Sequence, residues 1–348
     1  MPAMLTTVLL LTLGLGTTIA FASSHWLVAW MGLEINTLAI LPLMARHHHP
    51  RATEATTKYF LIQATAASLL LFATCSNAWL TGEWQVTQAG HALPSTMAIL
   101  ALALKLGLAP LHTWLPEVIQ GLDLSVGLVL STWQKLAPLA LLAQIAPSDS
   151  KLLIVLGVMS TFLGGWAGLN QVQIRKILAY SSIAHLGWMV IVLQFSPTIM
   201  LLALIIYIIM TTAAFLIFEM NKTTTINQLN IAWAKSPAVT ALAPLILLSL
   251  GGLPPLTGFM SKWLILTELM VKDLALLATL TALSALLSLY FYLRLSYTMT
   301  LTAGSNNLTA TALWRLGPPQ HFAPTPLFAA MALMLLPLMP SVITLLLQ

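Results

Sequence analysis

The stretch LALKLGLAPLHTWLPEV, Leu102 to Val118, carries a lysine, two prolines, a histidine and a glutamate within an otherwise apolar run. A proline in a helix interior removes a backbone hydrogen bond and clashes with the preceding turn, so Pro110 predicts a helix break. Lys105 lies five residues before that proline and His112 two residues after it. Because charged and polar groups cost free energy in apolar surroundings, their presence here predicts a functional site.

The composition of the whole chain indicates what surrounds this stretch. Of the 348 residues, 59% are hydrophobic and only 7% are charged, and the mean hydropathy is +0.91. A soluble domain carries about 25% charged residues. The composition therefore predicts an integral membrane protein and excludes a soluble fold.

Apolar segments long enough to cross a bilayer recur along the chain. A helix needs roughly 20 apolar residues to cross about 30 Å of hydrocarbon. Met1–Ala22 has no basic leader or small-residue cleavage site, so we expect it to be a first span and not a signal peptide. The sequence predicts an all-α, polytopic helical bundle of about eleven transmembrane segments, at 4–22, 25–44, 58–80, 95–121, 125–145, 152–169, 175–194, 198–218, 238–271, 274–297 and 324–347.

Two of these segments are interrupted by similar motifs. GLAPLHTW at Gly107–Trp114 and GLPPLTGF at Gly252–Phe259 share a Gly-Leu-x-Pro-Leu core at an offset of 145 residues. Five predicted helices fit into that offset, and an odd number of crossings inverts the topology. Paired, interrupted segments in two halves indicate a transporter's midplane site. We expect one transmembrane domain with inverted repeats at 1–150 and 151–297 and a loop and final helix at 298–348, the breaks formed by Gly107, Pro110, Gly252, Pro254 and Pro255.

Basic residues predict the orientation, because loops on the inner side of a membrane are enriched in lysine and arginine. With the amino terminus inside, the inner loops hold Arg46, Arg51, Lys58, Arg175, Lys176, Lys222, Lys235 and Arg315. The outer loops hold Glu83, Asp149, Lys151, Lys272 and Asp273. The amino terminus is therefore predicted inside and the carboxyl terminus outside.

Four ionisable residues fall near the centres of predicted spans: Glu34, Lys105, Lys135 and Lys262. Each costs roughly 2.5–3.5 kcal/mol at a bilayer centre on insertion scales. A lysine stem of about 6 Å cannot reach the interface across a half-span of about 15 Å. We therefore expect the four side chains to face one another, water or the broken backbone.

Such groups can store and pass on protons. Burial disfavours the charged form of an amine, whereas a nearby carboxylate favours it, so the protonation of a buried lysine responds to its neighbours. A structural ion pair is the alternative for any single lysine. Four such residues, two of them beside matched breaks, favour a proton relay.

Other titratable residues allow two interpretations. His112 and His185 either relay protons, since imidazole titrates near neutral pH, or hydrogen-bond to neighbouring helices. Glu117 and Asp123 fit either a proton entrance or a solvated edge. The run HHHP at 47–50 fits a loop that faces lipid headgroups better than a metal site.

No sequence feature indicates redox chemistry within this chain. The single cysteine, Cys75, excludes an intrachain disulfide and a self-contained iron–sulfur cluster, which needs about four ligands. A glycine-rich phosphate loop, a Cys/His zinc set and a Ser-His-Asp arrangement are all absent from the sequence. We expect no cofactor and no metal in this chain.

Together these motifs resemble a known family. A glutamate in an early span, a lysine before GLAPLHTWLPE, a lysine in the following span and GGLPPLTGFMSKW with another lysine are similar to the antiporter-like membrane subunits of respiratory complex I. The resemblance covers essentially the whole chain. It implies a proton channel driven by electron transfer from NADH to ubiquinone, with enzyme activity only as part of the complex.

The resemblance also implies roles and partners. Glu34 would pair with Lys105, Lys135 would link to a central axis, and Lys262 would stand on the exit side. NAD, FMN, iron–sulfur clusters and ubiquinone would be bound by other subunits. The partners would be other membrane subunits of the complex and lipids, without nucleic acid, in the mitochondrial inner membrane with the amino terminus on the matrix side and the carboxyl terminus on the intermembrane-space side.

Two other functions fit the composition. One is a free-standing cation/proton antiporter, which would transport ions as an isolated chain in liposomes. The other is a purely structural membrane subunit, in which replacing Lys105 or Lys262 by methionine would leave proton pumping intact.

Overall fold

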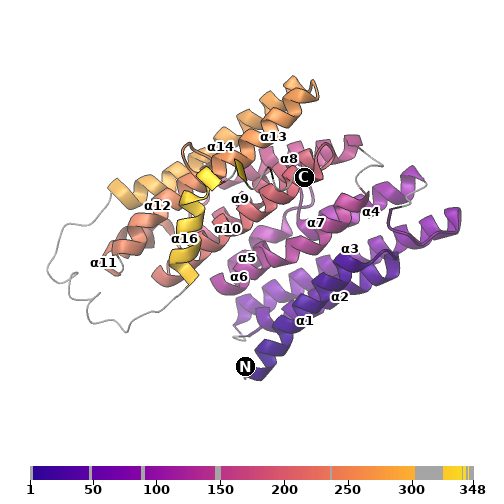
Figure 1. Cartoon of the computed structure of the whole chain (residues 1–348). Helices are drawn as coiled ribbons and strands as arrows, with labels where there is room; N and C mark the ends of the chain where they lie inside the picture. Colours follow the sequence, from indigo (N-terminus) through magenta and orange to yellow (C-terminus); the bar gives the residue numbers. More distant parts are fainter. Residues whose placement is uncertain are drawn as a thin grey trace. The chain divides into compact units, whose positions relative to one another are not determined.

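The computed structural model describes residues 3–46, 49–87, 91–145, 150–235, 237–301, 324–338, 340–341 and 344. Within these ranges the regular secondary structure is helical, apart from two isolated β-bridges, His25–Gln85 and Gln173–Thr225 (Figure 1). The predicted all-α class is thereby confirmed. His47 and His48 of the histidine run, as well as Asp149 and Arg315, lie outside the described residues.

The chain folds as two compact units, Met1–Ser160 and Thr161–Gln348. The first unit contains α1 (Ala3–Ala22), α2 (Trp26–Met44), α3 (Pro50–Thr81), α4 (Ala92–Leu106), α5 (Trp114–Gly121), α6 (Leu124–Ser131), α7 (Trp133–Ile145) and the start of α8 (Ser150–Gly168). The second contains the end of α8, then α9 (Ile174–Leu193), α10 (Pro197–Asn221), α11 (Ile226–Lys235), α12 (Pro237–Gly251), α13 (Thr257–Val271), α14 (Ala275–Leu301), α16 (Pro324–Met334) and the 3-10 turn η1 (Leu336–Leu338).

Eight stretches of helix among the described residues are long and apolar enough to cross a membrane. They are Met4–Ala22, Trp26–Met44, Pro50–Thr81, Leu124–Ile145, Lys151–Gly168, Ile174–Leu193, Pro197–Asn221 and Ala275–Leu301. Three shorter apolar helices, Ala92–Leu106, Ala238–Gly251 and Pro324–Met334, fall in the two interrupted segments and the final segment. A polytopic membrane protein is therefore confirmed.

Close helix contact through small residues builds the start of the first unit. A Cβ atom placed on Gly32 of α2 would lie 2.9 Å from the Gly16 carbonyl oxygen of α1 and 2.9 Å from the Ala20 nitrogen. Lipid tails are as apolar as the helix surfaces, so no hydrophobic effect drives helices together within hydrocarbon. Close backbone approach provides the van der Waals contacts that hold them instead. The two helices run side by side in Figure 1 (indigo), and α2 packs in turn on α3.

The two interrupted segments break with the same local backbone. Helix α4 ends at Leu106 and is followed by Gly107 with φ +77°, and α12 ends at Gly251 and is followed by Gly252 with φ +80°. These positive φ angles are ones that residues with a Cβ rarely adopt. The chain then resumes helical structure in α5 and α13.

Several helix ends differ from the sequence-based expectation, among them the start of α3. Helix α3 begins at Pro50 and not at 58, because proline suits a first helical position and His49 Nδ1 accepts a hydrogen bond from the Arg51 amide at 3.2 Å. Of the expected final span 324–347, the structure describes α16 and the turn that follows it, and several residues after position 338 lie outside the described residues. Helix α16 ends at Met334, since Pro337 has no amide hydrogen with which to continue the helix.

Two further elements were not expected. The segment 125–145 is interrupted at Thr132, between α6 and α7 and three residues before Lys135. The polar stretch 226–235 forms the additional helix α11, which is too polar to have been found by a search for membrane spans.

Candidate functional site

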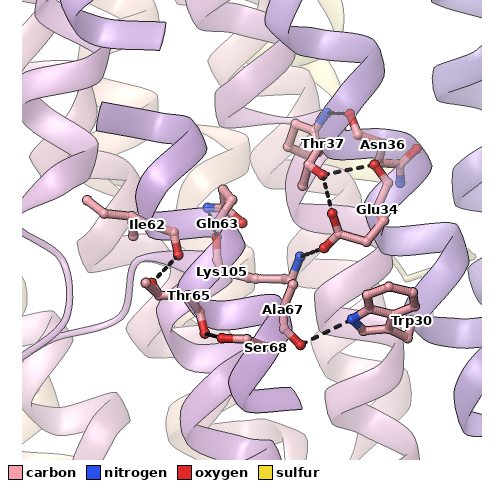
Figure 2. A network of polar contacts seen from close by, with 11 residues as sticks. Trp30, Glu34, Asn36, Thr37, Ile62, Gln63, Thr65, Ala67, Ser68 and Lys105 are labelled. Carbon is pink, nitrogen blue, oxygen red and sulfur yellow. Dashed lines mark hydrogen bonds and ion pairs between the residues drawn. The ribbon is translucent and has the colours of Figure 1, made fainter. Parts of the chain in front are cut away.

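An ion pair joins α2 to α4 inside the first unit. The Nζ atom of Lys105 lies 3.5 Å from Oε1 of Glu34, and the two side chains are 2% and 24% exposed. Thr37 Oγ1 donates a hydrogen bond to Glu34 Oε2 at 3.2 Å. Figure 2 shows the lysine extending toward the carboxylate, with Thr37 on the carboxylate's other side. The carboxylate is therefore held between the Lys105 amine and the Thr37 hydroxyl.

Neutral donors serve the carbonyl groups at the end of α4. The last carbonyls of a helix have no intrahelical partner, and in hydrocarbon they need another donor. Trp114 Nε1 donates to the Leu104 carbonyl at 3.1 Å, and Gln63 Nε2 donates to the Lys105 carbonyl at 3.4 Å. Because these carbonyls are satisfied by other side chains, the Lys105 amine is directed to Glu34.

A small cavity separates Lys105 from Lys135. The cavity has a volume of about 20 Å³, counted as the space open to the centre of a water molecule, and both lysines line it. About 10–15 Å³ on this measure suffices for one water molecule. Lys135, on α7, is 2% exposed. The other lining residues are Leu33, Asn36, Thr37, Tyr59, Gln63, Leu106, Trp114, Leu115, Leu130, Gln134 and Pro138.

Lys262 occupies a different environment, in the second unit. Its Nζ donates to the Gly251 carbonyl at 2.7 Å, so the amine serves the last residue of α12 directly. A Cβ atom on Gly252 would lie 2.8 Å from Lys262 Cδ, so the absence of a side chain there makes room for the lysine stem. A cation at the carboxyl end of a helix also interacts favourably with the helix dipole.

The two candidate histidines lie in different units. His112 is half-buried in the turn between α4 and α5, and its carbonyl accepts from the Leu115 amide at 3.1 Å. It does not line the cavity next to Lys105. His185 lies on α9, where its ring centroid is 5.5 Å from that of Tyr207.

The carboxylates at the predicted edge are exposed. Glu117 on α5 forms an ion pair with Lys58 of α3 at 3.0 Å, and 55% of the glutamate side chain is exposed. Asp123 precedes α6 and is also exposed. Both positions have the exposure that a solvated edge requires.

Sequence reasoning missed several polar residues of the site. Thr37 contacts the carboxylate, and the end of α4 is held by Gln63 and Trp114. Gln134 lines the cavity, and its Nε2 donates to the Asn36 carbonyl at 3.2 Å. The available signal was that both glutamines interrupt apolar segments. An intramembrane amide needs a partner almost as much as a charge does.

A metal centre is not found in the part of the chain that the structure describes. No group of three or more His, Cys, Asp or Glu side chains in those ranges has an arrangement that could hold an ion. Lysines predominate at the site, and a protonated lysine has no lone pair for a metal.

Fold and site thus define a class of membrane protein in which buried lysines stand next to interrupted helices. A family model described as "NADH:quinone oxidoreductase/Mrp antiporter, TM" matches residues 23–288, and the chain belongs to this family. A second model, described as "NADH dehydrogenase subunit 2 C-terminus", matches residues 289–343.

The similar proteins agree on one subunit. NADH-ubiquinone oxidoreductase chain 2 of Tetraodon nigroviridis is 68% identical over 98% of both chains, and that of Salmo salar is 64% identical over 98% of both. A chain of respiratory complex I from Thermus thermophilus is 27% identical with a TM-score of 0.82, covering 96% of this chain and 79% of its own length. The similarity to the antiporter-like membrane subunits of respiratory complex I that the motifs indicated is confirmed, and these relatives identify the similar subunit as chain 2.

Proposed function

We propose that this chain is the chain 2 membrane subunit of a proton-pumping NADH:ubiquinone oxidoreductase and that it conducts protons across the mitochondrial inner membrane. The names of its relatives support the assembly and the reaction. In this assembly it acts as one subunit of an H⁺-translocating enzyme, alongside other membrane subunits and lipids.

The observation that carries the proton-conducting role is the cavity lined by both Lys105 and Lys135. A proton on Lys105 is stabilised by Glu34 at 3.5 Å, and the cavity has room for a water molecule to link the lysine to Lys135. Weakening the Glu34–Lys105 contact favours release of that proton into the cavity. Moving one proton against 100 mV takes about 2.3 kcal/mol, which a change in one buried pair can supply.

Lys262 is the relay group of the second unit. Its amine is held against the end of α12, so its protonation is coupled to the interrupted backbone. His112 and His185 are secondary relay groups. His112 lies in the turn that follows α4, and His185 lies on α9, which packs on the Lys262 helix α13.

The proposal includes the finer architecture expected from the sequence. The chain crosses the membrane eleven times as inverted repeats at 1–150 and 151–297, with the amino terminus in the matrix and the carboxyl terminus in the intermembrane space. NAD, FMN, iron–sulfur clusters and ubiquinone are bound by other subunits, and this chain carries no cofactor.

Single substitutions in the assembled complex test the role. Each substitution removes one titratable group and leaves a side chain of similar size: Glu34→Gln, Lys105→Met, Lys135→Met and Lys262→Met. We expect NADH-driven proton uptake into proteoliposomes to fall by about tenfold or more in each, since a positioned proton-transfer group contributes roughly 10²–10⁴-fold to a rate. Lys272→Met, at an exposed position after α13, is the matched control and should pump normally.

Two outcomes would contradict the proposal. Normal pumping by an assembled complex that carries both Glu34→Gln and Lys105→Met would favour a purely structural subunit. Sodium-dependent proton exchange by the isolated chain in liposomes would favour a free-standing antiporter.

A further inference from the structure

Four hydroxyl side chains that the proposed relay does not use are buried together in the second unit. Ser181 and Ser182 lie on α9, Tyr207 on α10 and Tyr292 on α14, and each is 1% exposed. Three helices therefore direct hydroxyl groups into one apolar interior, where each polar group needs a partner.

Tyr292 is the least satisfied of these groups. Its hydroxyl is fully buried, and no atom in the described part of the chain lies at regular hydrogen-bond length and angle from it. Its hydroxyl interacts with the side chain of Ser181. Ser181 Oγ donates its own hydrogen to the Leu178 carbonyl at 2.7 Å, so the oxygen remains able to accept one.

Tyr207 of α10 has the corresponding arrangement with Ser182, which follows Ser181 on α9. Its hydroxyl interacts with Ser182, whose own hydrogen goes to the Ala179 carbonyl at 2.7 Å. The Tyr207 ring lies beside His185 at a centroid distance of 5.5 Å, and the two tyrosines are near enough to interact electrostatically. The two tyrosine–serine pairs therefore lie next to each other and to a titratable ring.

At its other end this cluster reaches the interrupted helix. A Cβ atom on Gly251 would lie 3.7 Å from Tyr292 Cδ2, which puts the tyrosine ring against the residue whose carbonyl accepts from Lys262. Within the second unit, Tyr292 therefore packs on the residue that accepts from Lys262, and Tyr207 packs on His185.

We propose that Tyr292, Ser181, Tyr207 and Ser182 form a hydroxyl relay that carries protons between Lys262 and His185, with water molecules completing the chain. For a transfer, the O–H groups of Ser181 and Ser182 first turn away from the carbonyls of their own helix. Each hydroxyl then accepts a proton on its oxygen from one neighbour as it gives its own hydrogen to the next. Each hydroxyl is neutral again once the transfer is complete, whereas the donor among Lys262 and His185 loses one positive charge and the acceptor gains it. Reorientation of the O–H bonds resets the chain. This inference rests on the proposed function, because it supplies Lys262 with a route.

Packing alone does not account for a tyrosine at position 292. Phenylalanine would fill the same space beside Gly251 without burying a hydroxyl that lacks a regular partner. The hydroxyl therefore points to a use in the working protein.

The test compares tyrosine-to-phenylalanine substitutions on one helix in the intact complex. Tyr292→Phe removes the buried hydroxyl, whereas Tyr290→Phe and Tyr297→Phe remove hydroxyls from side chains of residues that are 59% and 56% exposed. We expect NADH-driven proton uptake into proteoliposomes to fall at least about threefold in Tyr292→Phe, since water replaces a lost hydroxyl only in part. The two controls should pump like the parent.

Lys262→Met, measured in the same preparation, separates the possible failures. Normal pumping by Tyr292→Phe together with lost pumping by Lys262→Met would refute the hydroxyl relay and leave the proposed function in place. Normal pumping by both variants would remove the proposed function as well. If Tyr292→Phe lowers the yield of complex, Tyr207→Phe replaces it as the test, with pumping measured per assembled complex. We expect the same threefold loss of pumping. Unchanged pumping would contradict the relay.

Discussion

At the scale of single residues, the pair Glu34–Lys105 shows how a membrane protein keeps a charge in its interior. Taking two charges out of water is costly, and mutual attraction offsets this only when the remaining hydrogen bonds are also made. Thr37 supplies one of these to the carboxylate at 3.2 Å. The neighbouring backbone draws on Gln63 and Trp114, so it does not compete for the amine.

Removing one partner of this pair should therefore be worse than removing both. Lys105→Met leaves Glu34 partly buried without its cation, and we expect the free energy of unfolding to fall by about 1–3 kcal/mol. This is below the range for a fully buried pair because the glutamate side chain is 24% exposed. The double substitution Glu34→Gln with Lys105→Met should recover most of that loss, as read from the thermal unfolding midpoint of the assembled complex. Strictly additive effects would show that the two side chains do not interact, whereas recovered stability without pumping would separate folding from function.

The sequence predicted which residues would be costly in hydrocarbon, but not which of them would meet. Glu34 and Lys105 are 71 residues apart in the chain, and only helix packing brings them into contact. The donors Gln63 and Trp114 could not be assigned, because the need for them arises from carbonyl groups that a helix break leaves without partners.

At the scale of elements, the crossing of α1 and α2 depends on residues with almost no side chain. Gly16 and Gly32 allow the two backbones to touch, and the Asn36 side chain fills the space over Gly16. Such contacts provide van der Waals energy where the hydrophobic effect provides none.

A methyl group at Gly16 should separate these helices. We expect Gly16→Ala to lower stability by about 1–3 kcal/mol, as overpacking does in a tight core, because the added Cβ would lie 2.9 Å from the Gly32 carbonyl oxygen and closer still to Asn36. Gly14→Ala on the same helix is the control, since a Cβ there meets no atom within 4 Å. Thermal unfolding of the assembled complex measures both, and equal midpoints would show that the crossing tolerates the extra volume.

Helices were easier to predict than their ends. Hydrocarbon thickness fixes the length of an apolar segment, so α1, α2, α9 and α10 begin within a residue of the expected positions. Interruptions and polar extensions follow other rules. At the break, Thr132 Oγ1 donates to the Leu128 carbonyl at 2.7 Å, and before α11 the Thr224 amide donates to Gln228 Oε1 at 2.8 Å. The length of an apolar segment does not report such local hydrogen bonds.

At the scale of the whole molecule, the carboxyl-terminal helix is attached directly to the second interruption. Ser249 on α12 donates to the Ala332 carbonyl of α16 at 3.0 Å, and Thr257 at the start of α13 donates to the same carbonyl. That carbonyl lies in the last turn of α16, where no intrahelical donor remains. In Figure 1, α16 (yellow) lies beside α10 and α12, with which it packs.

Loss of these hydroxyls should loosen the terminal helix. We expect Ser249→Ala combined with Thr257→Val to increase amide hydrogen exchange in α16 by about fivefold or more, since a buried carbonyl without a partner costs about 1–3 kcal/mol. Ser261→Ala is the control, because its hydroxyl donates only to the Gly258 carbonyl within its own helix. Unchanged exchange in the double variant would mean that apolar packing alone holds α16.

The contact of Lys262 with Gly251 has a mechanical consequence. When Lys262 loses its proton, the positive charge that stabilises the carboxyl end of α12 is lost with it. Protonation of this amine and stabilisation of the last turn of α12 are therefore coupled. At Lys105 an indole and an amide hold the helix end instead, so its amine is left to bind the Glu34 carboxylate. In the proposed relay, a change in the protonation of Lys262 therefore alters a helix end directly, whereas a change in the protonation of Lys105 does not.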